Sequence, residues 1–165
     1  MIKIMRLKLL FFGMLVVVVF TSCDNVILEP ANPTEQIAVN LRADIYQTST
    51  YVSNDQWEAT DEVGLYMKKT GQPLTAAGAV YSDAANVKMN IVGQTLTSSP
   101  PIMYPASGNV DFVAYYPYTA SVNPDFAVPV NIAGQEAGLP VEILYSNNAT
   151  SQAPADLPVT LNFNY

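Results

Sequence analysis

Apolar and polar residues alternate along several short runs of this sequence. The clearest run extends from Ile37 to Ile45, where every second residue is apolar. A period of two is typical of a β-strand with one buried face. The same alternation recurs in five later runs, whose apolar positions are Val63-Leu65-Met67, Val87-Met89-Ile91, Val110-Phe112-Ala114-Tyr116, Phe126-Val128-Val130-Ile132 and Val159-Leu161-Phe163.

The prolines separate these runs, and all twelve follow Glu29. Because proline cannot donate a ladder hydrogen bond and interrupts helices, this placement favours short strands and disfavours long helices. Pro129 falls inside the run from Phe126 to Ile132 and therefore predicts an edge strand or a bulge there. We predict an all-β fold, an antiparallel β-sandwich of about seven strands of the transthyretin-like or Greek-key type.

The first 22 residues have the composition of a secretion signal. Lys3, Arg6 and Lys8 form a basic start, and Leu9 to Phe20 is an apolar run of twelve residues. Such a run has the length of a signal-peptide core and is shorter than the ~20 residues that cross a membrane as a helix. We therefore expect residues 1–22 to be a signal peptide.

Cys23, the only cysteine in the chain, directly follows the short residues Thr21 and Ser22. This junction resembles a lipobox, in which the cysteine thiol takes a diacylglyceryl group and becomes the first residue after cleavage. We expect a lipidated Cys23, a tether over residues 23–36 and a β-sandwich domain over residues 37–165. The expected location is the cell outer membrane, lipid-anchored and exposed at the surface.

The composition excludes several classes of function. The chain has no histidine, which removes imidazole bases and the Ser-His-Asp and Cys-His nucleophilic sites. Its net charge of −7 argues against nucleic acid as a partner, because binding a phosphate backbone needs clustered Lys and Arg. None of its glycines forms a phosphate-binding motif, so no nucleotide is expected. We predict a protein that is not an enzyme and that has no catalytic residues, metal or cofactor.

Several segments resemble the fimbrillin family, and together they cover most of the chain from Val39 to Phe163. Their order and spacing also fit the family. The similar segments are Trp57 with Asp61–Met67 (DEVGLYM), Ile102–Pro105 (IMYP), Val110–Tyr118 (VDFVAYYPY), Glu142–Ser146 (EILYS) and Val159–Phe163 (VTLNF). The family usually continues beyond the last of these segments into a second β-domain, so we expect a truncated or one-domain variant.

The resemblance implies a structural component, or an accessory or anchor subunit, of cell-surface fimbriae (pili) involved in adhesion. Its partners would be other fimbrial subunits, joined by β-strand exchange. In fimbrillins, cleavage after an arginine near the start of the fold removes a first strand. Arg42 is the only arginine after the signal peptide and matches that position in kind. The alternative is that Arg42 is simply an outward-facing residue of the first strand.

A second hypothesis is a surface lipoprotein that binds glycan or another extracellular ligand through loop aromatics. The candidate ligand-facing residues are Trp57, Tyr115 and Tyr118. Packing is the competing interpretation for each of them, and the strand alternation predicts that Tyr116 points inward with Phe112.

Two further patterns have only weak functional value. Asp55, Glu58, Asp61 and Glu62 offer oxygen ligands of the kind that calcium takes, but they lack the spaced loop of an EF-hand and favour a solvated turn. Asn148-Ala149-Thr150 matches an N-glycosylation pattern, which means little in a chain with a bacterial-type lipobox.

Overall fold

A computed structural model of the chain describes residues 36–46, 56–123, 125–129 and 143–164. The chain divides into two units, Met1–Pro33 and Thr34–Tyr165, and all described residues belong to the second. The predicted signal peptide (1–22), Cys23 and the tether up to residue 35 lie outside the described residues. In the part of the chain that is described, no helix is long and apolar enough to cross a membrane.

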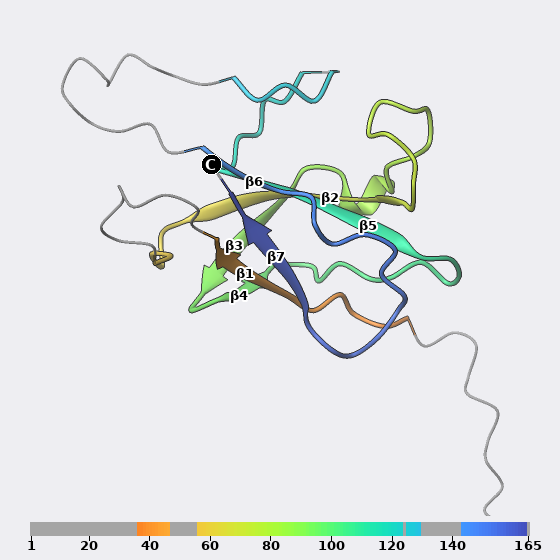
Figure 1. Cartoon of the computed structure of the whole chain (residues 1–165), viewed down its shortest axis with the longest axis horizontal. Helices are drawn as coiled ribbons and strands as arrows, with labels where there is room; N and C mark the ends of the chain where they lie inside the picture. The colour runs from red at the N-terminus through yellow and green to blue at the C-terminus, as the bar shows by residue number, and fades with distance from the viewer. Residues whose placement is uncertain (1–35, 47–55, 124, 130–142, 165) are drawn as a thin grey trace, which may run out of the picture. The chain divides into compact units, whose positions relative to one another are not determined.

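Seven strands and one 3-10 turn make up the described fold (Figure 1). The prediction of an all-β fold with about seven strands is confirmed. The elements are β1 (Leu41–Ile45), β2 (Glu62–Lys69), η1 (Ser82–Ala84), β3 (Val87–Val92), β4 (Thr95–Thr97), β5 (Val110–Tyr116), β6 (Leu144–Ser146) and β7 (Val159–Phe163).

All seven strands belong to one sheet, in the order β6-β5-β2-β3-β4-β1-β7. The described strands thus form one mixed sheet where an antiparallel sandwich is predicted, because β1 and β7 are parallel, in register from Leu41↔Val159 to Ile45↔Phe163. A parallel pair needs a long connection, and here the other five strands supply it. The two outermost strands, β6 and β7, meet at an isolated bridge between Tyr145 and Asn164, so the sheet curls back on itself.

Two predicted strands differ from the structure in extent. The run from Ile37 to Ile45 becomes a strand only at Leu41, and the part before it forms a single bridge, Ala38↔Met103. The run from Phe126 to Ile132 is not a strand over its described residues, 126–129, because Phe126 has a φ of 60°, in the left-handed region that breaks a strand. Residues 130 and 132 lie outside the described residues.

The core lies on the inner face of the sheet, where the alternating residues predicted from the sequence are buried. Val63, Leu65 and Phe112 are fully buried. Tyr116 packs partly buried against them, as its inward parity predicts.

The outer face of β2 and β5 is also covered. Tyr66 and Tyr115 are buried there, with ring centroids 6.3 Å apart, and Phe126 packs edge-on against Tyr66. Gly64 is paired with Tyr115 across the two strands, and a β-carbon at Gly64 would overlap the tyrosine ring. The glycine therefore makes room for the second buried layer.

A buried ion pair joins the ends of the same two strands. Asp111 Oδ2 accepts hydrogen bonds from Lys68 Nζ at 2.6 Å and from the Gly71 amide at 3.0 Å, and its Oδ1 accepts one from the Ser151 amide at 2.8 Å. Burial opposes ionisation of this carboxyl, but these bonds, with one from Thr70, outweigh it and lower the pKa of Asp111 to about 2. One carboxylate thus fastens the Lys68–Gly71 turn and the Ser151 loop to β5.

Candidate assembly site around the first strand

The first strand is an internal strand of the sheet. It pairs with β4 through Leu41↔Leu96 and Arg42↔Thr95, and with β7 along its whole length. Leu41 and Ala43 point into the core and are 1% and 0% exposed. Removing this strand would therefore uncover apolar core and unpair backbone groups on two neighbours.

The residues just before β1 form backbone hydrogen bonds with a different set of partners from those of β1. The Val39 amide donates to the Ile102 carbonyl at 2.8 Å, and the Tyr104 amide donates to the Ile37 carbonyl at 2.9 Å. Val159, at the start of β7, donates its amide to the Asn40 carbonyl at 2.9 Å. The segment from Ile37 to Arg42 therefore runs along Ile102–Tyr104 on one side and reaches β7 on the other.

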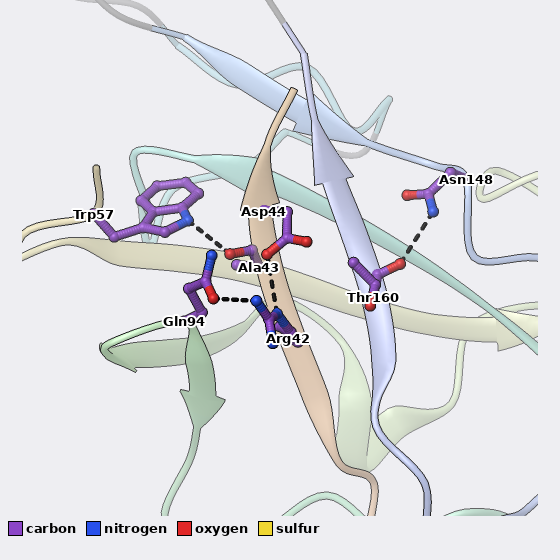
Figure 2. A network of polar contacts seen from close by, with 7 residues as sticks. All are labelled: Arg42, Ala43, Asp44, Trp57, Gln94, Asn148 and Thr160. Carbon is purple, nitrogen blue, oxygen red and sulfur yellow. Dashed lines mark hydrogen bonds and ion pairs between the residues drawn. The ribbon is translucent and has the colours of Figure 1, made fainter. Parts of the chain in front are cut away.

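The side chain of Arg42 lies on the outer surface of β1 (Figure 2). It is about half exposed, at 48%, and donates to Asp44 Oδ1 at 3.1 Å and to Gln94 Oε1 on the β3–β4 turn. An exposed ion pair of this kind contributes only about 0–1 kcal/mol. The fold therefore does not depend on an arginine at this position, which matches the outward-facing alternative considered from the sequence and leaves the cleavage prediction untested.

The Arg42–Ala43 peptide bond is flanked by occupied backbone groups. The Ala43 amide donates to the Gln94 carbonyl at 2.8 Å, and the Ala43 carbonyl accepts a hydrogen bond from Trp57 Nε1 at 3.0 Å (Figure 2). A protease that binds its substrate as an extended strand needs these groups free. Cleavage after Arg42 in the folded chain would thus require β1 to open first.

Trp57 closes one end of the core beside β1. Its ring meets Phe163 of β7 edge-on with centroids 5.1 Å apart, and Tyr116 with centroids 5.5 Å apart. The indole is partly buried against the core cluster, and its N–H is bonded to β1. The side chain thus has a packing role that links β1, β5 and β7.

Tyr115 lies beside Tyr66 on the outer face of the sheet, whereas Trp57 contacts Tyr116 of the opposite parity. The Tyr118 amide donates to the Glu62 carbonyl at 2.8 Å. Tyr115 is 8% exposed, and its hydroxyl lies 2.6 Å from Asn86 Oδ1 and 2.9 Å from the Thr119 carbonyl. Tyr118 is half-buried. Burial, with a smaller effect of Tyr115 and Tyr118, raises the pKa of Tyr66 to about 12. The structure therefore does not bring the three candidate ligand-facing aromatics together on one surface.

The acidic residues near Trp57 are engaged in local contacts. Asp61 Oδ2 accepts from the Glu58 amide at 2.7 Å, its Oδ1 accepts from the Tyr116 hydroxyl at 3.1 Å, and Glu62 pairs with Lys88 at 2.8 Å. Asp55 lies outside the described residues. Among those that are described, no three His, Cys, Asp or Glu side chains are grouped so that they could hold a metal.

Solved structures share this fold. A proposed cell adhesion protein from Bacteroides uniformis matches 78% of this chain and 48% of its own length, with a TM-score of 0.52 and 21% identity. A second proposed cell adhesion protein, from Bacteroides ovatus, matches 78% of this chain and 52% of its own, with a TM-score of 0.51 and 18% identity. This chain thus spans about half the length of these proteins. A search of curated proteins finds no match.

The family is shown by the sequence profile of fimbrillin-like proteins, which matches residues 50–164. The chain therefore belongs to the fimbrillin-like family, as its motifs indicate. The match covers β2 to β7 and begins after β1.

Proposed function

We propose that this chain is a structural, accessory or anchor subunit of cell-surface fimbriae that serve in adhesion and join by strand exchange. Membership in the fimbrillin-like family supports this role. The observation that carries the exchange step is the position of β1. This strand is internal to the sheet, its inner face is buried, and it contains Arg42, after which cleavage is expected.

Cleavage after Arg42 would remove the segment from Ile37 to Arg42 and leave Ala43–Ile45 paired with β7. The backbone groups of Ile102, Tyr104 and Val159 would then lose their partners, and the inner-face site of Leu41 would be empty. Exposed apolar surface costs roughly 25 cal/mol per Å². An incoming strand would recover that free energy and would be aligned by the freed main-chain groups.

The N-terminal sequence of fibre-associated protein tests this proposal. A fibre protein that begins at Ala43 would support the subunit role, whereas one that begins at Cys23 would overturn cleavage and leave an anchor or accessory role. Arg42→Lys is the matched variant, because it keeps a cation beside Asp44 and Gln94 but removes the arginine. It should fold normally and fail to enter fibres that depend on an arginine-specific protease.

We also propose that lipid on Cys23 holds the protein at the outer membrane. Stable anchoring takes more than one acyl chain, since a single chain binds only marginally. Cys23→Ala should move the protein from the membrane pellet to the soluble fraction, with Ser22→Ala as a control that keeps the thiol. An alanine variant that stays in the pellet would contradict the lipid anchor.

A further inference from the structure

Among the described strands, none pairs along the outer edge of β7, the last strand in the sheet order. The backbone N–H and C=O groups of the odd-numbered residues of β7 point toward β1. The Phe163 carbonyl accepts a hydrogen bond from the Tyr46 amide, and the Val159 amide donates to the Asn40 carbonyl. The backbone groups of the even-numbered residues, Thr160 and Asn162, point away from β1. Such an edge presents free N–H and C=O groups to any other extended chain.

An asparagine side chain occupies this edge where a neighbouring strand would lie. The Asn162 amide donates to Asn148 Oδ1 at 2.8 Å, and Asn148 Nδ2 donates to the Thr160 carbonyl at 3.0 Å (Figure 2). A primary amide has the donor and acceptor of a peptide group, so Asn148 bonds to the edge as one residue of a strand would. The buried Ser146 hydroxyl of β6 donates to Asn148 Oδ1 at 2.8 Å and fixes its orientation.

A second asparagine completes the coverage. Asn164 Nδ2 donates to the Asn162 carbonyl at 3.1 Å. The Asn164 amide and carbonyl exchange two hydrogen bonds with Tyr145 of β6, both at 2.9 Å. The outward-facing backbone groups of Asn162 and Asn164, and the Thr160 carbonyl, therefore all have hydrogen-bond partners.

The strand itself would suit pairing with a second copy of this chain. Residues 159–164 read VTLNFN and contain no charge, whereas exposed edges are commonly protected by lysine or other charged residues. Uncharged segments with alternating apolar residues readily pair with copies of themselves. In this strand the protection comes from amide side chains instead of charge.

We infer that Asn148 and Asn164 seal the outer edge of β7 against a second copy of the chain. Self-pairing is thereby prevented at this edge. A further consequence, which rests on the proposed function, is that an incoming strand can enter the sheet only at the position of β1, between β4 and β7.

Substitution of Asn148 in the full, uncleaved chain tests the seal. In Asn148→Ala the Asn162 amide loses its acceptor, and its hydrogen exchange at low concentration should rise by about tenfold or more. At high concentration the same amide should become protected again, and analytical ultracentrifugation should show dimers. Asn148→Gln, whose longer side chain puts the amide out of register, should behave in the same way.

Two control variants keep the test specific. Asn147→Ala changes the exposed neighbour of the same residue type and should stay monomeric with normal exchange. Asn148→Asp retains the acceptor for the Asn162 amide, so this amide should stay protected. If folded Asn148→Ala and Asn148→Gln remain monomeric at every concentration, the inference is overturned. Because the uncleaved chain is used, that result would leave cleavage after Arg42 untouched, and an uncut Arg42 would leave the seal untouched.

Discussion

The β2–β5 pair and β1 are both internal to the sheet, but they are held in different ways. β2 and β5 pair over six residues, are buried on both faces and are joined by the Lys68–Asp111 ion pair. β1 pairs with β4 over only two residues, is buried on one face and presents Arg42 to the surface. The comparison teaches that a strand can be internal in sheet order, with β7 paired along its whole length, and still have only one packed face.

The largest effect on stability is expected from substitution of Gly64, because the Tyr115 ring fills the space beside this glycine. In Gly64→Ala the new methyl group would overlap the Tyr115 ring, which is buried and held by Asn86 and Thr119. Overpacking of this kind should lower the free energy of unfolding by about 3 kcal/mol, measured by urea denaturation. In a Tyr115→Ala background the same substitution should cost almost nothing. Equal costs in both backgrounds would show that the two residues do not compete for space.

Acid should weaken the β2–β5 region next. The pKa of Asp111 is about 2 in the folded chain, below the ordinary value of 3.8, so its ionised form stabilises the fold. That contribution is complete above about pH 5, falls as the pH drops toward 2, and amounts to about 2 kcal/mol. Urea unfolding between pH 5 and pH 2 should therefore show a smaller loss in Asp111→Asn than in the natural chain. An identical pH dependence in the two proteins would argue against this role of Asp111.

A smaller effect is expected at β1. Trp57→Phe keeps an aromatic ring against Phe163 but removes the N–H that donates to the Ala43 carbonyl. The expected loss of stability is about 1 kcal/mol. Trypsin should then cut after Arg42 about fivefold faster, since opening of β1 precedes cleavage, while cutting after Lys88 should change less. Equal acceleration at both sites would mean that the substitution loosens the whole sheet and not β1.

The smallest effect, and the only expected gain, concerns Tyr104. Its side chain is 1% exposed, and its hydroxyl has no hydrogen-bond partner among the described residues. Burial also raises the pKa of this hydroxyl. Tyr104→Phe removes an unsatisfied polar atom from a ring that packs edge-on against Phe112, and should raise stability by up to about 1 kcal/mol. A loss of stability in urea denaturation would contradict this account.

Alternation predicted the strands that have a clear buried face. β2, β3, β5 and β7 were all located by their apolar parity, since each of these strands covers the core with alternate residues. β6 was indicated only by the family resemblance of Glu142–Ser146. Alternation does not predict β4, because Thr95–Thr97 contains a single apolar residue, Leu96. A repeat of two residues can be recognised only when at least two apolar residues show it.

Contacts between distant segments could not be predicted from local patterns. Tyr115 lies on the outward parity of β5, and its burial depends on the space left by Gly64 on the neighbouring strand. Asn148 matched only a glycosylation pattern, because its contacts with β7 exist only once the loop after β6 meets Thr160 and Asn162. The partners of Arg42 likewise depend on Gln94, a turn residue without any signal in the sequence.

The parallel pairing of β1 with β7 also affects the order in which parts of the sheet form during folding. More than one hundred residues separate Leu41 from its partner Val159, so this pair closes the longest loop among the paired strands, and the entropy of closure makes such contacts late and slow to form. The chain is synthesised from its N-terminus, and β1 therefore exists long before the strand that will lie beside it. During that interval the backbone around Arg42 lacks its β7 partner, so this side of the sheet is completed only when the last part of the chain folds.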